Sequence, residues 1–223
     1  MKIVVYSAIF GGKDKISDQQ PPGADYVLFT ESFGPIKPVI WSVLHPNGID
    51  AGDPSRTSRY FKLLPHLHFP TYDYSIWVDG NMELVWSPLE LVQKFLIETG
   101  HFHAQVAYDV DRYAPSRIHS NIYHEALHCI KLRKDDPVKI KSQIKSYRAE
   151  GFPETPALWM GGLIIRQHKH PCSILLGDAW YAEIVKQSRR DQIALPYVLW
   201  KLGLEVHTID PSLNLTRRLP HLY

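Results

Sequence analysis

The sequence contains little cysteine and no long hydrophobic run. Cys129 and Cys172 are its two cysteines, and without CxxC spacing they predict neither a disulfide framework nor a cysteine zinc site. No apolar stretch approaches the roughly 20 residues of a membrane span, and the opening MKIVVYSAIFGG lacks the pattern of a signal peptide. We therefore expect a soluble protein in a reducing, cytoplasmic compartment, with peripheral attachment to a membrane left open.

Neither sign of charge dominates the chain, and the usual short motifs for nucleotides and zinc are absent. Lys and Arg total 25 against 23 Asp and Glu, which gives a formal net charge of +2. This balance provides no general basic field for nucleic acid or acidic lipid, so an anion site must be local. The chain has no GxGxxG, no GKS/T and no HExxH, which excludes a dinucleotide fingerprint, a P-loop and a helical zinc motif.

What the sequence does contain is an alternation of apolar runs and amphipathic stretches. Its 223 residues, 44% of them hydrophobic, predict a single domain over residues 1–223 with one core. Alternating strands and helices predict an α/β fold with a parallel sheet. The expected strands are Ile3–Phe10, Tyr26–Thr30, Val39–Leu44, Tyr74–Val78, Ala104–Tyr108, Leu158–Ile165 and Glu205–Ile209.

The expected helices follow from capping residues and prolines. Helices are predicted after Asp53-Pro54, after Ser87-Pro88 to about Glu98, within 117–150 as one or two helices, and after Pro171. A final helix should begin near Leu195, because Pro196 disfavours a helix running unbroken through Asp191.

A carboxylate and a glycine follow the apolar run SIWV. In open α/β sheets, ligands bind beyond the carboxyl ends of the strands, so Asp79 is a candidate for holding a divalent cation near phosphate oxygens. Asp79-Gly80 is also a standard turn pair, and a simple tight turn remains an alternative.

Three basic residues recur on the helix after Asp53. Arg56, Arg59 and Lys62 are spaced by three, so their side chains fan over adjacent faces and together suit one diphosphate. A solvated basic face is the alternative.

Two glycine pairs suggest close approach of the backbone to another group. Gly11-Gly12 follows the first strand, where a loop can pass near a ligand, although the pair alone is a weak signal. Gly161-Gly162 interrupts an apolar strand, which indicates close approach of a ligand or another backbone, and a bulge explains it equally well.

A polar block precedes the last expected helix. Asp191 and Gln192 should lie in a turn or first helical turn, exposed and orientable, with Arg189 and Arg190 holding the carboxylate ionised. A plain charge at a helix N-terminus is the alternative.

Five sequence blocks, taken in order, span nearly the whole chain. They are VVYSAIFGG, SRYFKLLPHLHFP, YSIWVDGNMEL, EGFPETPALWMGGLIIR and RRDQIALPYVL. Their series resembles the DUF616 family of glycosyltransferase-like proteins, related to nucleotide-sugar-dependent transferases of the GT-A fold. The resemblance implies a GT-A-like, Rossmann-like fold with a mixed, mainly parallel sheet flanked by helices.

The resemblance also implies roles for individual residues. Asp79-Gly80-Asn81 corresponds to the DxD motif, whose acidic residues hold Mn²⁺ or Mg²⁺ on the donor diphosphate. Asn81 supplies an uncharged amide at the second position, so metal dependence is in doubt, and the metal is dispensable if Arg59 and Lys62 neutralise the phosphates.

The remaining blocks are expected around the nucleoside and the sugar. Phe10, Gly11 and Gly12 would line the nucleoside pocket, and Gly161-Gly162 would pass beneath the sugar. Asp191, with Gln192 beside it, would face the acceptor or the sugar hydroxyls, and in an inverting transferase Asp191 would take the proton of the acceptor.

The function implied is transfer of a hexosyl or pentosyl group from a nucleotide-diphosphate sugar to an unidentified hydroxyl. A metal-assisted hydrolase on the same fold and a catalytically degraded sugar-nucleotide or glycan-binding module remain alternatives. A glycan, a lipid-linked glycan or a small molecule is the expected acceptor. Nucleic acid is less favoured, because the basic residues of 139–148 are interleaved or flanked by Asp135, Asp136 and Glu150, which leaves that group and Arg217-Arg218 as solvated charge.

Overall fold

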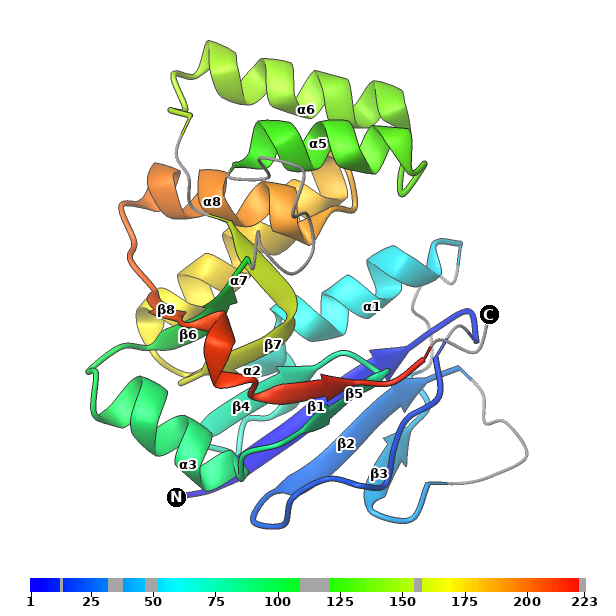
Figure 1. Ribbon diagram of the computed structural model, residues 1–223, viewed down its shortest axis with the longest axis vertical. Coiled ribbons are helices and arrows are strands. Elements are labelled where there is room, and N and C mark those ends of the chain that lie inside the picture. Colours follow the sequence, from blue (N-terminus) through cyan, green and yellow to red (C-terminus); the bar gives the residue numbers. More distant parts are fainter. Residues whose placement is uncertain (13, 32–37, 47–51, 109–120, 155–157, 221–223) are drawn as a thin grey trace.

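The structure, a computed structural model, describes residues 1–12, 14–31, 38–46, 52–108, 121–154 and 158–220. A seven-stranded sheet of order β3-β2-β1-β4-β7-β6-β8 forms its centre (Figure 1). β7 pairs antiparallel with both neighbours, while every other pairing in the sheet is parallel. The strands are β1 (Ile3–Ile9), β2 (Asp25–Thr30), β3 (Trp41–Leu44), β4 (Tyr74–Val78), β6 (His103–Ala107), β7 (Trp159–Arg166) and β8 (His207–Ile209).

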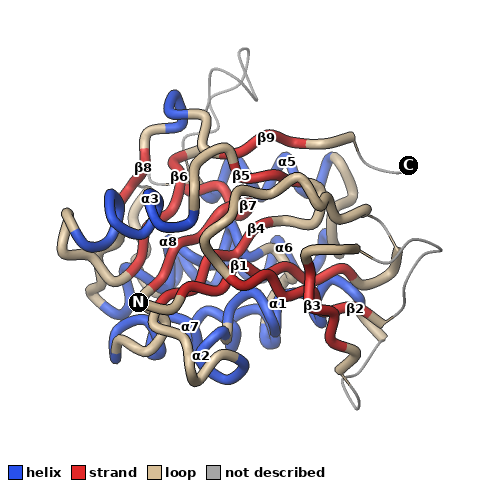
Figure 2. The backbone as a smooth tube through the Cα atoms, turned by 90° about the horizontal axis from the view of Figure 1, so that it is seen from below, coloured by secondary structure: helices blue, strands red, loops and turns tan. Residues whose placement is uncertain are grey.

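Helices cover both faces of this sheet, which confirms the mixed, mainly parallel α/β fold in a single domain. Figure 2 shows α1 and α7 on one side and α3, with a second small sheet of β5 (Met82–Leu84) and β9 (Thr216–Arg218), on the other. The helices are α1 (Pro54–Leu63), α2 (Pro65–His68), α3 (Pro88–Val92), η1 (Gln93–Ile97), α5 (Ile122–Lys131), α6 (Pro137–Ala149), α7 (Pro171–Lys186), α8 (Asp191–Leu202) and η2 (Pro211–Leu213).

Two hydrophobic cores, one on each face, hold these layers together. Val4 and Tyr6 of β1 pack into the core under α1, α7 and α8, whereas Ile3 and Val5 pack toward α3 and η1. Since β1 is buried on both faces, its sequence is a continuous apolar run rather than an alternating one.

Capping residues set the helix starts as the sequence predicted. The Asp53 carboxylate accepts hydrogen bonds from the backbone N–H groups of Ser55 and Arg56, and Pro54 is the first helical residue. Ser87 and Glu90 form a capping box at α3. Residues 121–150 contain two helices, α5 and α6, packed side by side.

The prediction of a helix start near Leu195 is wrong. α8 begins at Asp191 and contains Pro196 in its interior. Burial of the apolar side chains around Pro196 outweighs the lost backbone hydrogen bond, because Ile193, Leu195 and Val198 are at most 2% exposed. The Trp180 indole also donates to the carbonyl of Asp191 and fixes the first turn.

The C-terminal part of the chain was also incompletely predicted. β8 begins at His207 rather than Glu205, and β5 and β9 were not predicted. Each of these two strands has three residues, too few for a periodic pattern, and their pairing joins segments more than 130 residues apart.

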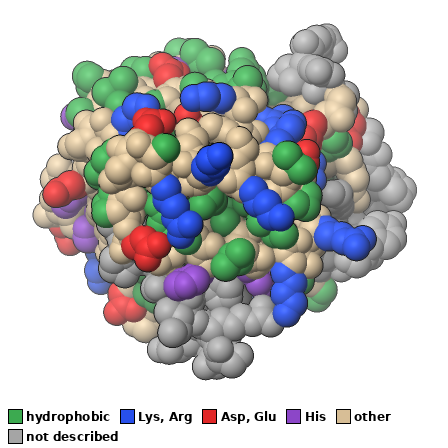
Figure 3. Space-filling view, turned by 90° about the horizontal axis from the view of Figure 1, so that it is seen from above, with side chains coloured by type: hydrophobic (Ala, Val, Ile, Leu, Met, Phe, Trp, Pro, Cys, Tyr) green, Lys and Arg blue, Asp and Glu red, His purple; other side chains and the backbone are tan. Residues whose placement is uncertain are grey.

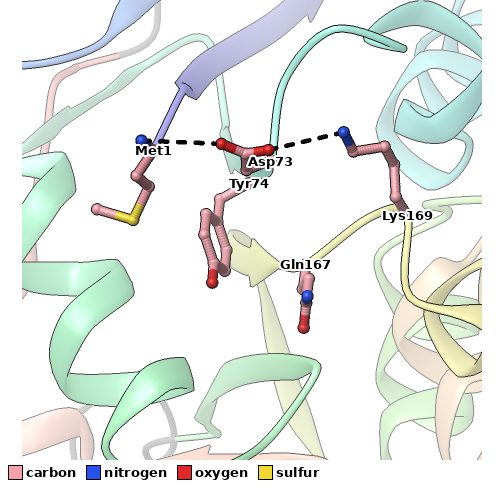
Figure 4. A pocket seen from close by; sticks show the side chains of 5 residues that line it. All are labelled: Met1, Asp73, Tyr74, Gln167 and Lys169. Atoms are coloured by element: carbon pink, nitrogen blue, oxygen red, sulfur yellow. Dashed lines mark ion pairs between the residues drawn. The ribbon is translucent and has the colours of Figure 1, made fainter.

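A small cavity of about 290 Å³ lies at the amino end of β4 (Figure 4). Its Asp73 carboxylate lies 4.0 Å from the amino group of Met1 and 3.7 Å from the Lys169 ammonium. The charges of this cavity are therefore already compensated, at the opposite end of β4 from Asp79. No helix in the described ranges is long and apolar enough to cross a bilayer.

Gly203 caps the C-terminus of α8, and substitutions there test the cost of a left-handed backbone conformation. Its φ of +62° lies in the left-handed region, and an added Cβ would meet no atom within 4 Å. We expect Gly203→Ala to lower the free energy of unfolding by about 1 kcal/mol through backbone strain alone, measured by urea denaturation. Gly203→Asn should cost less, because Asn tolerates this conformation; equal losses would contradict the explanation.

Candidate functional site

A cavity of about 250 Å³ lies at the edge of the sheet where β4 ends and β7 begins. Because β7 runs antiparallel to β4, the first residues of β7 lie beside the end of β4. The N–H of Asp79, the residue directly after β4, donates to the carbonyl of Gly162 at 2.9 Å. This is the edge at which α/β proteins bind ligands. The lining residues are Arg59, Lys62, Asp79, Tyr108, Lys134, Met160, Gly161, Gly162, Arg190, Asp191, Gln192 and Arg218.

Cations outnumber carboxylates around this cavity. Five Lys and Arg side chains line it, against the carboxylates of Asp79 and Asp191. Lys134 and Arg218 are exposed and make no ion pair with any residue in the described part of the chain. The site is therefore a local region of positive potential in a nearly neutral protein, suited to a polyanion.

A buried ion pair joins α1 to the start of α8. The Lys62 ammonium lies 2.5 Å from Oδ2 of Asp191, and Nε of Arg59 lies 3.2 Å from the same oxygen. Lys62 is 2% exposed and Asp191 is 4% exposed. The sequence prediction that Asp191 is exposed and orientable is therefore wrong, because tertiary packing of α8 carries its first turn into the protein.

The surroundings of Asp191 keep it ionised. Burial alone would raise the pKa of this carboxyl, but the adjacent Arg59 and Lys62 charges, with Arg190, hold its pKa well below its usual range. The expectation that neighbouring cations ionise Asp191 is confirmed for Arg190, with Arg59 and Lys62 as the stronger partners. Arg189 instead pairs with Asp53 and Asp135.

Arg190 is held in turn by α5. Its Nη2 lies 3.6 Å from Oε1 of Glu125, which is 2% exposed. The Cys129 thiol donates to the same carboxylate oxygen, and burial raises the pKa of this thiol to about 12. Cys129 is therefore a structural thiol, and α5 fixes one of the five cations of the cavity.

Asp79 is the more accessible carboxylate of the two. Its side chain is 34% exposed, its Oδ1 accepts a hydrogen bond from the Trp77 indole, and the Lys62 ammonium lies 4.0 Å away. The Asp79 carbonyl also accepts from the N–H of Met82, which closes a turn. Asp79-Gly80 thus forms the tight turn that the sequence allowed and also presents a carboxylate to the cavity, while a cation held by Asp79 stays a prediction.

Gly161 and Gly162 make room for side chains. A Cβ on Gly161 would lie 2.8 Å from Nζ of Lys62 and 3.1 Å from Oδ2 of Asp191, and one on Gly162 would lie 2.6 Å from the sulfur of Met82. The sequence predicted close approach of a ligand or another backbone; what approaches instead is side chains, the buried ion pair at Gly161 and Met82 at Gly162. The pairing of β6 with β7 is also irregular here, as a bulge would be.

Six of the predicted donor-binding residues lie outside the lining of the cavity, namely Phe10, Gly11, Gly12, Arg56, Gly80 and Asn81. Arg56 turns to the end of α7, where it donates to the carbonyls of Ile184, Val185 and Gln187, so the three basic residues of α1 do not converge on one ligand. The segment of Phe10, Gly11 and Gly12 follows β1 at the same edge of the sheet. Both glycines have positive φ, and Phe10 stacks on Phe61.

The predicted metal ligands do not face the same space. Asp79 lines the cavity, whereas Asn81 is 3% exposed and donates through Nδ2 to the carbonyl of Leu219 at 3.4 Å. Across the described residues, no three His, Cys, Asp or Glu side chains gather as a metal site would require. Among the described residues, the carboxylates at the cavity are Asp79, beside the Lys62 ammonium, and Asp191, already paired with Lys62 and Arg59, so these side chains by themselves do not form a divalent metal site. Gly80 has a packing role, because a Cβ there would lie 2.7 Å from Ile9.

The fold and the cavity together define an α/β domain with a cation-lined cavity at the carboxyl edge of its sheet. The TOD1/MUCI70 glycosyltransferase-like domain matches residues 37–216, and the chain belongs to this family, which confirms the resemblance to DUF616. Over 188 residues the chain is 28% identical to the probable hexosyltransferase MUCI70 of Arabidopsis thaliana, a match that covers 80% of this chain and 31% of that protein. The chain therefore corresponds to about a third of this relative's length.

Several lining residues had no role in the sequence prediction. Lys134 lies in the turn between α5 and α6, Tyr108 and Met160 lie at the ends of β6 and β7, and Arg218 belongs to β9. Arg218 was noted only as a basic pair with Arg217, and it reaches the cavity through the unpredicted pairing of β5 with β9. No local motif marks these positions, since long-range packing brings them together.

The depressed pKa of Asp191 gives a stability prediction. In the unfolded chain this carboxyl titrates near its ordinary 3.8, so on acidification the unfolded state binds the proton first. The contribution of ionised Asp191 is therefore complete above about pH 5 and falls as the pH drops through 4 and below. We expect Asp191→Asn to lower the free energy of unfolding by about 3 kcal/mol near pH 7, with the difference from wild type shrinking by pH 3.5.

Urea denaturation at a series of pH values measures this difference. Glu98→Gln removes an exposed carboxylate at the end of η1 and serves as the control. It should change stability by less than about 0.5 kcal/mol at every pH. A pH-independent loss in Asp191→Asn would show that shape rather than charge makes this residue important.

Proposed function

We propose that the chain is a glycosyltransferase that moves a sugar from a nucleotide-diphosphate donor to a hydroxyl acceptor. The observation that carries the proposal is the cavity in which five cations meet two carboxylates, within a domain of a glycosyltransferase-like family. A relative described as a probable hexosyltransferase supports a hexose as the transferred sugar. The acceptor hydroxyl belongs to a glycan, a lipid-linked glycan or a small molecule in this proposal.

The cations bind the leaving diphosphate. Glycosyl transfer breaks the bond between the anomeric carbon and a β-phosphate oxygen and builds negative charge on the departing diphosphate, and fixed cations stabilise that charge without reorganisation. Arg218 and Lys134 have no ion-pair partner in the described ranges, so they are the side chains most available to phosphate oxygens. Lys62 and Arg59 also line the cavity and add positive charge, while each stays ion-paired with Asp191.

The two carboxylates take different roles. A general base works best with a pKa near the working pH, and the low pKa of Asp191 makes it a weak proton acceptor. Asp191 is therefore a positioning residue that holds Lys62 and Arg59, in place of the catalytic base that the sequence suggested. Asp79 is the carboxylate that meets the ligand, either at a sugar hydroxyl or at the acceptor proton, and the Gln192 amide offers hydrogen bonds beside it.

Cations of the chain replace a protein-built metal site in this proposal. Within the described ranges, Asp79 is the one part-exposed carboxylate at the cavity that could meet Mn²⁺ or Mg²⁺, and Asn81 donates to the carbonyl of Leu219. We therefore derive no step through a metal, and the dependence on Mn²⁺ or Mg²⁺ expected from the DxD resemblance becomes an experimental question.

The direct experiment uses a panel of nucleoside diphosphates and nucleotide sugars. Ligands that bind the native state raise the unfolding temperature, so a thermal-shift screen identifies the donor. The bound donor is then incubated with hydroxyl acceptors, and products are separated by mass. Sugar transfer supports the proposal, release of free sugar alone supports a hydrolase, and tight binding without turnover supports a binding module.

Arg218 and Arg56 give contrasting predictions. Arg218→Gln should weaken nucleoside diphosphate binding about tenfold while leaving the affinity for the nucleoside unchanged, because the lost contacts are to phosphate. Arg56→Gln, on the same face of the fold but outside the cavity, should leave both affinities unchanged and lower stability instead. Isothermal titration calorimetry measures both, and a loss of diphosphate affinity in Arg56→Gln alone would reverse the assignment.

Asp79 is tested by turnover and by chelation. Asp79→Asn keeps the size of the side chain and the turn, so we expect a folded protein with turnover lowered by about 100-fold and diphosphate affinity within threefold of wild type. Wild-type turnover should persist in EDTA. Activity that vanishes in EDTA and returns with Mn²⁺ would show instead that Asp79 acts through a metal.

A further inference from the structure

The outermost layer of the protein is the helical pair α5 and α6, which carries an apolar groove (Figure 1). The groove has a volume of about 360 Å³ and lies between the two helices. Its apolar lining includes Ile130 and Ile144, which are half-buried, and Leu127, which is 66% exposed at the rim. Two more exposed apolar side chains, Leu132 and Val138, flank the turn between the helices. A soluble surface rarely gathers this much exposed apolar area without a partner.

A row of cations borders the groove on the α6 side. Lys141, Lys145 and Arg148 all line it, and their spacing of four and three residues places them on one face of α6. Figure 3, which looks down on the molecule from above, shows hydrophobic side chains lying among Lys and Arg side chains. Lys141 and Lys145 form no ion pair with any described residue, while Arg148 stacks over Tyr123 and pairs with the exposed Glu154.

The whole helical pair is more basic than the rest of the chain. Between residues 122 and 149 the sequence has seven Lys and Arg against Glu125, Asp135 and Asp136, in a protein with a net charge of +2. Glu125 is buried and pairs with Arg190. Both aspartates are engaged, since Asp135 accepts from the N–H of Arg189 and Asp136 caps α6. The positive charge of this face is therefore not compensated locally.

We infer that the α5–α6 face docks on an anionic lipid bilayer, with Leu127 and the groove taking acyl chain and the α6 row taking headgroup phosphates. An apolar channel beside a row of cations is complementary to an amphiphile whose charged end and hydrocarbon end lie side by side. Lys141 and Lys145 line the groove and are exposed. Lysines at a membrane surface can lay their aliphatic stems along apolar surface and keep their ammonium groups at the headgroups. Nucleic acid would leave the apolar groove unused, so the groove favours lipid.

Docking in this orientation brings the candidate site near the lipid surface. Lys134, in the turn between α5 and α6, lines the cationic cavity, and Glu125 of α5 holds Arg190 of that cavity. The inference itself rests on the groove and the α6 row alone and does not depend on the proposed transferase activity.

Vesicle co-sedimentation of the full chain tests the inference. We expect binding to vesicles of phosphatidylcholine with 30% phosphatidylserine at low salt, weakening as salt increases, and little binding to phosphatidylcholine alone. Lys141→Glu/Lys145→Glu should lower the partition coefficient on the anionic vesicles by at least about tenfold. Leu127→Ser should lower it by about threefold or more at every salt concentration, since it removes apolar contact.

A matched double variant controls for net charge. Lys15→Glu/Lys94→Glu changes the charge by the same amount at exposed positions away from the helical pair and should keep wild-type partitioning within about twofold. Circular dichroism confirms that each variant is folded, and binding of nucleoside diphosphates reports on the cavity separately. Absence of wild-type binding to anionic vesicles, or equal losses in both double variants, would overturn the inference. Binding to an acidic peptide or to RNA with no vesicle binding would do so as well.

Discussion

The buried contact of Asp191 with Lys62 and Arg59 is the interaction on which the candidate site depends. Each partner is expensive to bury alone, because a charge removed from water needs compensation nearby. Together they place one negative charge at the centre of a positive cavity, so that Lys62 and Arg59 stay close to each other despite their mutual repulsion. Without this carboxylate, nothing would offset the repulsion between Lys62 and Arg59 at the carboxyl edge of the sheet.

Other features of the fold serve this contact. Gly161 leaves the space that the ion pair occupies, and the Trp180 indole holds the carbonyl of Asp191 so that α8 starts at the cavity. The positive end of the α8 dipole also favours the ionised carboxylate in its first turn. A central strand, two helices and a buried indole thus converge on one side chain, which explains why a Pro in the middle of α8 is tolerated.

The sequence predicted the sheet and most helices because their signals are local. Apolar runs gave β1, β2 and β4, and the caps at Asp53 and Ser87 gave α1 and α3. It failed at Asp191 because packing overrode the local effect of Pro196, and it could not find β5 and β9 because three-residue strands carry no periodicity.

The candidate site was predicted in part for the same reason. Asp79, Lys62 and Gly161 each belong to a local sequence motif in a different element, and the structure brings them together in the cavity. Arg56 shares the spacing of Arg59 and Lys62, yet its side chain caps the carbonyls at the end of α7. Spacing on a helix defines neighbours on that helix, but it does not say which of them faces a distant strand.

The antiparallel direction of β7 has a consequence for how such a domain can vary. β6 ends and β7 begins at the same edge of the sheet. There the N–H of Tyr108 donates to the carbonyl of Leu158 at 2.9 Å, which joins the two ends of the connection between these strands. That stretch, with α5 and α6, leaves the sheet and returns to it at one point beside the cavity. It is therefore an insertion whose length can change while the register of the strands stays the same.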